Sequence, residues 1–193
     1  GRNLMSMLLK DVGVGGNPDL VGKVIGTLLV AGGPSVGFKL DDFVGELNSA
    51  KDGKRKCLAL AVLGQAGFRL GSASPLQPQL FMSYFPSNLE QVPLAAAVAL
   101  GRAGAGNIST YLPVILSEMS KPSSPQYLLL HSLKETLQLQ ANDSEIIPYS
   151  QQMWQSLVVA SQAEDNKAIG AECIGRLAII DPRTYLPQLQ VGL

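Results

Sequence analysis

The sequence predicts an all-α protein, a right-handed α-solenoid built from antiparallel helix pairs. The first observation is a recurring phrase, which stands at Leu63-Gly64-Gln65-Ala66, Leu100-Gly101-Arg102-Ala103 and Ile174-Gly175-Arg176-Leu177. The second is a Tyr-Leu-Pro motif, which stands at Tyr111-Leu112-Pro113 and again at Tyr185-Leu186-Pro187. Self-similarity with a period of about 35–40 residues is typical of stacked helical repeats. No run of residues alternates between apolar and polar as a strand does.

The whole chain, residues 1–193, is predicted to form one array of about four to five repeats. The repeats fall roughly at 1–33, 34–72, 73–107, 108–142 and 143–182, with a partial repeat at 183–193. Hydrophobic residues make up 46 % of the chain and charged residues 16 %, as expected for interior repeats that have neighbours on both sides. Because the chain opens and closes inside the helical pattern, we expect it to be a fragment of a longer solenoid.

Each repeat is expected to begin with a first helix, A, that has a proline near its start. A proline costs little in the first turn of a helix, where its missing N–H would have no partner. The prolines in question are Pro34, Pro78, Pro113, Pro148 and Pro187. The A helices are therefore expected at 36–48, 77–85, 110–120, 145–160 and 185–193, with an earlier one at about 3–11.

A second helix, B, is expected to follow in each repeat, at 18–31, 52–70, 89–105, 125–139 and 164–180. In three of them an acidic residue stands 11 or 12 positions before the glycine of the recurring phrase, namely Asp52, Glu90 and Glu164. Acidic side chains near a helix start interact with its free N–H groups. Asn17 is the expected N-cap of the first B helix. Pro93 lies a full turn inside the third, so we expect that helix to begin late or to kink.

Glycine recurs at one phase of the B helices, although a glycine inside a helix costs up to about 1 kcal/mol relative to alanine. The recurrence therefore predicts a packing role, which we expect to be a close contact between A and B helices. Gly104 and Gly106 are expected to end the third B helix in the manner of C-cap glycines.

Charge and composition argue against a nucleic-acid or membrane partner. The chain has 15 Lys+Arg and 15 Asp+Glu, so its formal net charge is zero. Its one basic cluster is interrupted by Asp52 and is expected to be a solvated helix start; it consists of Lys51, Lys54, Arg55 and Lys56. The longest uncharged apolar run, 24–38, is too short and too broken by Gly-Gly-Pro to span a bilayer.

No residue set in the sequence predicts catalysis, a metal site or a cofactor. His131 is the only histidine, and we expect it to pack against or cap a helix. Cys57 and Cys173 lie in apolar stretches of different repeats, which predicts free, buried thiols and favours a reducing compartment. Trp154 is expected to pack in the core or between repeats. The glycine-rich stretch 13–17 lacks the Gly-Lys-Ser/Thr ending of a phosphate loop and indicates a turn.

Helix pairs of this length, with acidic B-helix starts and apolar ladders, resemble HEAT repeats. The run Gln126-Tyr127-Leu128-Leu129-Leu130-His131-Ser132-Leu133-Lys134-Glu135 is similar to a long run in the cullin-associated neddylation-dissociated proteins, the Cand family. The similarity extends to Tyr111-Leu112-Pro113, Pro148-Tyr149 with Trp154, 171–177, 180–182 and Leu186-Pro187. It covers about 58–193, whereas the first 50 residues match only in pattern.

The resemblance implies a non-catalytic segment from the middle or later part of a long HEAT superhelix. Cand proteins wrap unmodified cullins and help exchange their substrate-receptor modules. The expected partner is therefore a cullin with its RING subunit, and the expected localisation is cytoplasmic and nuclear. Because the family's cullin contacts lie largely at its two ends, a middle segment is expected to supply spacing and curvature more than contact. The isolated fragment is also expected to self-associate through uncapped ends.

B helices usually line the concave face of a HEAT superhelix, so polar residues on them are candidates for partner contact. These candidates are Arg102, Lys134, Glu135, Glu172 and Arg176. A plain solvated surface explains the same residues. Two alternative functions stay open. One is another HEAT scaffold or a nuclear transport receptor, and the other is a HEAT-type hydroxylase, against which the shortage of histidine argues.

Overall fold

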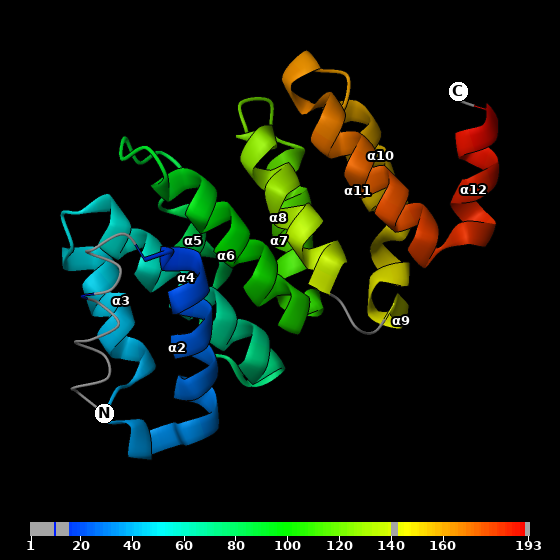
Figure 1. The fold of residues 1–193 in the computed structure, drawn as a ribbon. Helices are drawn as coiled ribbons and strands as arrows, with labels where there is room; N and C mark the ends of the chain where they lie inside the picture. The colour runs from blue at the N-terminus through cyan, green and yellow to red at the C-terminus, as the bar shows by residue number, and fades with distance from the viewer. Residues whose placement is uncertain (1–9, 11–15, 140–142, 192–193) are drawn as a thin grey trace.

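The computed structural model describes residue 10, residues 16–139 and residues 143–191. Helices account for most of these residues, and no residue among them lies in a β-strand. The helices follow one another across the molecule from α2 at one end to α12 at the other (Figure 1). The predicted all-α solenoid of helix pairs is therefore confirmed. The A helix expected at 3–11 falls outside the described residues, except for Lys10.

The B helices stack side by side and form the spine of the molecule. They are α2 (Pro18–Gly32), α4 (Gly53–Leu70), α6 (Val92–Gly106), α8 (Gln126–Leu139) and α11 (Lys167–Ile180). Each packs directly on the next, with the closest association between α2, α4, α6 and α8. Their bounds lie within three residues of those predicted from the sequence. We call the side of the molecule formed by their exposed surfaces the B-helix face.

In the view of Figure 1, the middle A helices lie behind the B helices, whereas the first and the last lie at the two ends of the molecule. They are α3 (Leu40–Ser49), α5 (Pro78–Met82), α7 (Ile108–Met119), α10 (Ser150–Ala160) and α12 (Pro182–Val191). The first four each pack on the B helix that follows them. The A segment expected at 145–160 is broken into α9 (Asp143–Ile146), a 3-10 turn at Ile147–Tyr149 that contains Pro148, and α10.

The expected placement of the prolines is only partly correct. Pro78 begins α5 as predicted, but Pro113 and Pro187 lie well inside α7 and α12. These two helices begin earlier than expected because the N–H of Tyr111 donates to the carbonyl oxygen of Asn107 and that of Tyr185 to the carbonyl oxygen of Asp181. Both prolines therefore lie beyond the first turn of their helices.

Two of the residues predicted at B-helix starts, Asn17 and Asp52, cap their helices, whereas the acidic residues Glu90 and Glu164 do not. The Asn17 carboxamide oxygen accepts from the N–H of Asp19 at 3.0 Å, and Asp52 accepts from the N–H of Lys54 at 3.1 Å. Glu90 does not cap α6, because Pro93 delays the start of that helix to Val92. Glu164 begins a 3-10 turn before α11, and its carboxylate pairs with Lys167 instead.

The prediction that Gly104 and Gly106 act as a C-cap is wrong. The C-cap of α6 is Asn107, whose backbone has φ −146° and ψ 65°. A methyl group at Gly106 would lie 2.5 Å from the carbonyl oxygen of Phe68, so that glycine is required by close packing of α6 against α4. C-cap glycines with positive φ occur elsewhere, at Gly33 with φ 51° and Gly71 with φ 62°.

The glycine of the recurring phrase lies between B helices, and the expected contact between A and B helices is wrong. A Cβ at Gly64 of α4 would lie 2.9 Å from the Cα of Ala99 on α6. One at Gly101 of α6 would overlap the carbonyl oxygen of Ser132 on α8 and lie 2.9 Å from the Cβ of Glu135. Gly175 of α11 has no atom within 4 Å of its Cβ position. The phrase therefore permits close approach of consecutive B helices where a further B helix is present.

The tyrosine of the Tyr-Leu-Pro motif joins consecutive repeats. Tyr111 is 1 % exposed, and its hydroxyl donates to the carbonyl oxygen of Leu76 at 3.0 Å. The Tyr185 hydroxyl is 3.1 Å from Ser150 Oγ, again 35 residues earlier in the chain. Trp154 stacks on Tyr185 with ring centroids 4.5 Å apart, so the expectation that it packs between repeats is confirmed.

Candidate partner-binding site on the B-helix face

A chain of polar contacts crosses four B helices on the B-helix face. Gln65 Nε2 on α4 donates to Thr27 Oγ1 on α2 at 3.1 Å, and Gln65 Oε1 accepts from Arg102 on α6 at 3.1 Å. Arg102 Nη2 then donates to Glu135 Oε1 on α8 at 2.6 Å. We call these four residues the polar ladder. It ties each B helix to the next through side chains that come from four different repeats.

The position after the phrase glycine supplies three members of the polar ladder. Gln65 follows Gly64, Arg102 follows Gly101, and Thr27 follows Gly26 in a further copy of the phrase. The glycine brings two B helices together, and the side chain of the next residue then bonds to a neighbouring B helix beside that contact. Sequence reasoning missed Thr27 and Gln65 because neither is charged. Their position in the phrase is the signal that could have found them.

The Arg102–Glu135 ion pair is largely withdrawn from water. The two side chains are 9 % and 17 % exposed, and Arg102 donates to both Gln65 and Glu135. A partly buried ion pair needs such additional hydrogen bonds to offset the loss of hydration. These two candidate residues therefore bond to each other within the fold.

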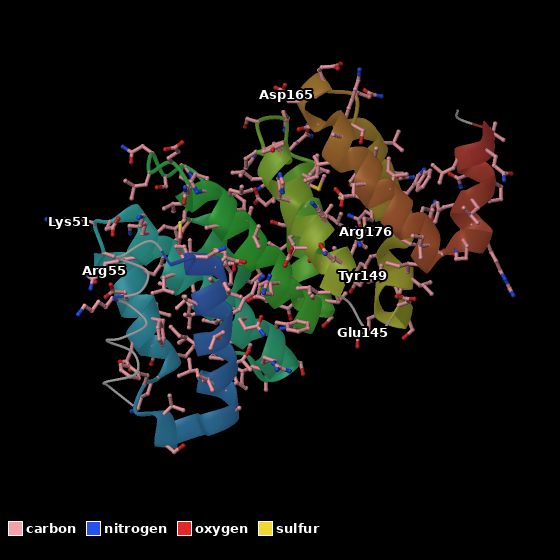
Figure 2. The ribbon with its side chains drawn as sticks, in the orientation of Figure 1. Lys51, Arg55, Glu145, Tyr149, Asp165 and Arg176 are labelled. Carbon is pink, nitrogen blue, oxygen red and sulfur yellow. The ribbon has the colours of Figure 1, made fainter. Side chains whose placement is uncertain are left out.

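The other three candidate residues form a second, more exposed cluster between α8 and α11. The Glu172 carboxylate lies 3.3 Å from Lys134 Nζ and 3.6 Å from Arg176 Nη2. Their side chains are 32–42 % exposed. Because one carboxylate faces two cations, the cluster keeps an excess positive charge. Figure 2 places Arg176 well away from Lys51 and Arg55, which lie at the α3–α4 end of the molecule.

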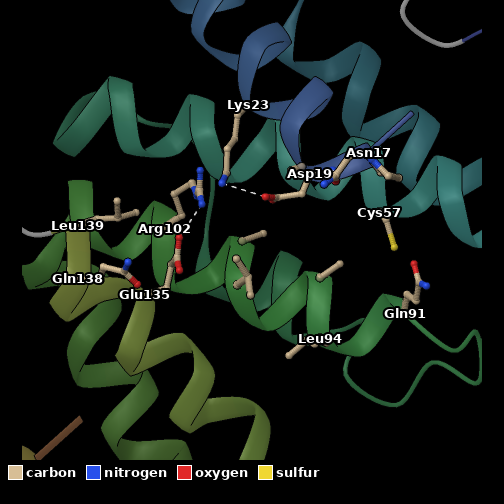
Figure 3. Close-up of a pocket in the computed structure, with 15 residues that line it drawn as sticks. Asn17, Asp19, Lys23, Cys57, Gln91, Leu94, Arg102, Glu135, Gln138 and Leu139 are labelled. Carbon is tan, nitrogen blue, oxygen red and sulfur yellow. Dashed lines mark hydrogen bonds and ion pairs between the residues drawn. The ribbon is translucent and has the colours of Figure 1, made fainter. Parts of the chain in front are cut away.

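A groove of about 650 Å³ opens on the B-helix face over α6 (Figure 3). Its wall includes the Arg102–Glu135 pair and a second ion pair, in which Lys23 Nζ lies 2.9 Å from Asp19. Its remaining lining is neutral: Asn17, Pro18, Cys57, Ala61, Gln91, Leu94, Ala95, Val98, Ala99, Gln138 and Leu139. Among these residues, only Arg102 and Glu135 were predicted from the sequence as candidates for partner contact. The others were missed because the groove lies between four helices that are far apart in the chain.

The two cysteine thiols near the B-helix face are held in their neutral forms. Burial, with a smaller contribution from Asp52, raises the pKa of the Cys57 thiol to about 11. Burial is also the largest cause that raises the pKa of Cys173, to about 12, and Cys173 Sγ lies 3.6 Å from the Leu130 carbonyl oxygen. Both thiols are free, and protonated thiols are poor nucleophiles.

His131 lies beside the second cluster and packs edge-on against Tyr127, with ring centroids 4.7 Å apart. Burial and the charge of Lys134 lower the pKa of His131, against an opposing effect of Glu172. Its expected packing role is confirmed. Among the residues described, no group of three or more His, Cys, Asp or Glu side chains could hold a metal ion. No helix in the described part of the chain has the length and apolarity needed to cross a bilayer.

Comparison with known proteins decides the family. The chain is 50 % identical over 191 residues, 98 % of its length, to the Emericella nidulans cullin-associated NEDD8-dissociated protein 1, C-terminal part. It belongs to the cullin-associated NEDD8-dissociated family. Relatives with this name are 37 % identical over 142 residues in Drosophila melanogaster and 35 % identical over 149 residues in Arabidopsis thaliana. These matches cover 69 % and 75 % of the chain.

The Cand resemblance predicted from 126–135 and its flanking motifs is thus confirmed. No family model matches the chain. The chain spans 18 % of the Emericella relative's length, 11 % of the Drosophila relative's and 12 % of the Arabidopsis relative's. It therefore corresponds to a small part of a Cand protein.

Proposed function

We propose that this chain is part of a non-catalytic Cand scaffold that binds a cullin with its RING subunit. Such a scaffold regulates the assembly of cullin–RING ubiquitin ligases and the exchange of their substrate receptors. The observation that carries this proposal is the 50 % identity over 98 % of the chain to a protein named for its association with cullins. We further propose that the protein acts in both cytoplasm and nucleus.

Within that scaffold, the segment acts by fixing the relative orientation of its repeats. The polar ladder links four consecutive B helices, and the phrase glycines set how closely these helices approach. The more exposed cluster of Lys134, Glu172 and Arg176 contacts the partner, because the charges of its side chains are accessible. Arg102 and Glu135 support this surface from within.

The test uses the full-length protein that contains this segment, with a cullin–RING complex prepared in its unmodified form and in its form carrying the ubiquitin-like modifier. We expect strong binding to the unmodified complex and weak binding to the modified one. Equal binding to both forms, or binding to neither, contradicts the proposal. A small GTPase in its two nucleotide states is the second probe, because a nuclear transport receptor would respond to that state.

The contribution of the segment itself is tested with paired variants of the full-length protein. We expect the K134A/R176A variant to weaken cullin binding severalfold, since it removes both cations of the exposed cluster. K51A/K54A removes two cations from the start of α4 and the residues just before it, at the α3–α4 end, and serves as the matched control. An equal effect of both pairs would indicate a general electrostatic attraction.

A further inference from the structure

We propose that the groove over α6 binds an extended, uncharged stretch of the partner's chain, with one apolar side chain resting on Leu94. This inference depends on the proposed function only for the identity of the partner, a cullin–RING complex. It assigns to the groove a chemistry different from that of the charged cluster between α8 and α11.

The floor of the groove is an apolar stripe of α6. Leu94, Ala95, Val98 and Ala99 lie on one side of that helix, and Ala61 of α4 adjoins them. Leu94 is 43 % exposed, whereas Val92 and Leu100 on the same helix are buried. A partner side chain that covered Leu94 would remove apolar surface from water on both molecules.

The charges around the groove are already balanced within the molecule. Lys23 pairs with Asp19 at 2.9 Å, and Arg102 pairs with Glu135 at 2.6 Å. Among the described residues, these four are the only charged ones that line the groove, and together they carry no net charge. A charged partner group would lose hydration there without gaining an opposite charge. The groove therefore selects an uncharged segment.

Two glutamine amides stand on either side of Leu94 (Figure 3). Gln91 and Gln138 line the groove, are exposed, and make no side-chain hydrogen bond to any other described residue. Each carboxamide offers one acceptor and two N–H donors, which match the C=O and N–H groups of a peptide backbone. An extended chain leaves those backbone groups free, whereas a helix uses them internally.

The size of the groove agrees with an extended occupant. Its volume of about 650 Å³ accommodates a few residues. One apolar side chain of such an occupant would rest on Leu94. Gln91 and Gln138 would hydrogen-bond to the backbone on both sides of it.

The experiment compares Leu94→Asp with Val159→Asp in the full-length protein, using the unmodified cullin–RING complex as the probe. Val159 is a 61 % exposed apolar residue on α10 and does not line the groove. We expect L94D to weaken binding about tenfold or more, Q91A/Q138A to weaken it severalfold, and V159D to leave it unchanged. Thermal melts establish that each variant is folded, and Leu94→Ser replaces L94D if that variant melts early.

A photoreactive side chain at position 94 identifies the occupant directly. We expect it to cross-link to an uncharged, non-helical stretch of the cullin–RING complex, located by mass spectrometry. If wild-type protein binds the complex but L94D and L94S bind equally well, the groove inference is wrong and the proposed function stands. Cross-linking to a charged or helical stretch also overturns the inference. If wild-type protein does not bind the complex, the proposed function fails, and the inference fails with it.

Discussion

Arg102 and Glu135 lie 33 residues apart in the chain, yet the Arg102 guanidinium donates to the Glu135 carboxylate at 2.6 Å across the α6–α8 interface. Replacing Arg102 with Met leaves a carboxylate that is 17 % exposed without its cation. We expect R102M to lower the free energy of unfolding by about 2 kcal/mol, measured by urea denaturation. The variant E135M should lower the free energy of unfolding by less than R102M does. The double variant should recover part of the summed loss, which gives a coupling energy of about 1–3 kcal/mol. Simple additivity would show that the pair contributes nothing as a unit.

Gly101 and Gly175 occupy the same position in two copies of the phrase but have opposite surroundings. A methyl group at Gly101 would overlap the Ser132 carbonyl oxygen, whereas one at Gly175 meets no atom within 4 Å. We expect Gly101→Ala to destabilise this chain by about 1–3 kcal/mol through overpacking. Gly175→Ala should stabilise it by up to about 1 kcal/mol, because alanine favours the helix. Thermal unfolding of both variants checks the signs, and a neutral G101A would show that the B helices can separate without cost.

The Tyr111 hydroxyl is predicted to stabilise the contact between repeats. Its removal in Tyr111→Phe leaves the buried Leu76 carbonyl oxygen without that donor. We expect a loss of about 1–2 kcal/mol in the free energy of unfolding. Tyr127→Phe is the matched control, since Tyr127 is 48 % exposed and its hydroxyl bonds to no described residue, and it should change stability by less than about 0.5 kcal/mol. Equal effects of the two variants would contradict a specific role for the Tyr111–Leu76 hydrogen bond.

The helices were predictable because their signals are local. Apolar spacing, the Asn17 cap and the position of Pro93 each depend on a few neighbouring residues, and all three agree with the structure. The helix that packs against each phrase glycine could not be predicted from such local signals. A period shows that Gly64 and Gly101 are equivalent, but which helix packs on them depends on the arrangement of the repeats in space.

In the candidate site, too, local features were predictable from the sequence and the spatial arrangement of the helices was not. Charged residues on B helices identified Arg102, Lys134, Glu135, Glu172 and Arg176 from the sequence. Their separation into a partly buried pair and an exposed cluster depends on side-chain register between helices about 35 residues apart. The groove over α6 had no local signal, because its lining comes from α2, α4, α6 and α8 together.

The two buried thiols predict that the chain loses stability in alkaline solution. Burial raises the folded-state pKa to about 11 for Cys57 and about 12 for Cys173, from an ordinary value of 9.0. Unfolded thiols therefore release protons first, and the free energy of unfolding falls as pH rises from about 9 toward 11–12, by up to about 1.4 kcal/mol per pH unit for each thiol. The variant C57A/C173A should be less stable at pH 7 but should lose stability less steeply above pH 9. Urea denaturation across this range measures how the free energy of unfolding of each protein depends on pH. Tyr111 and Tyr84, whose pKa values burial also raises, contribute equally to both proteins. Identical slopes for the two proteins would therefore rule out the thiols as a cause.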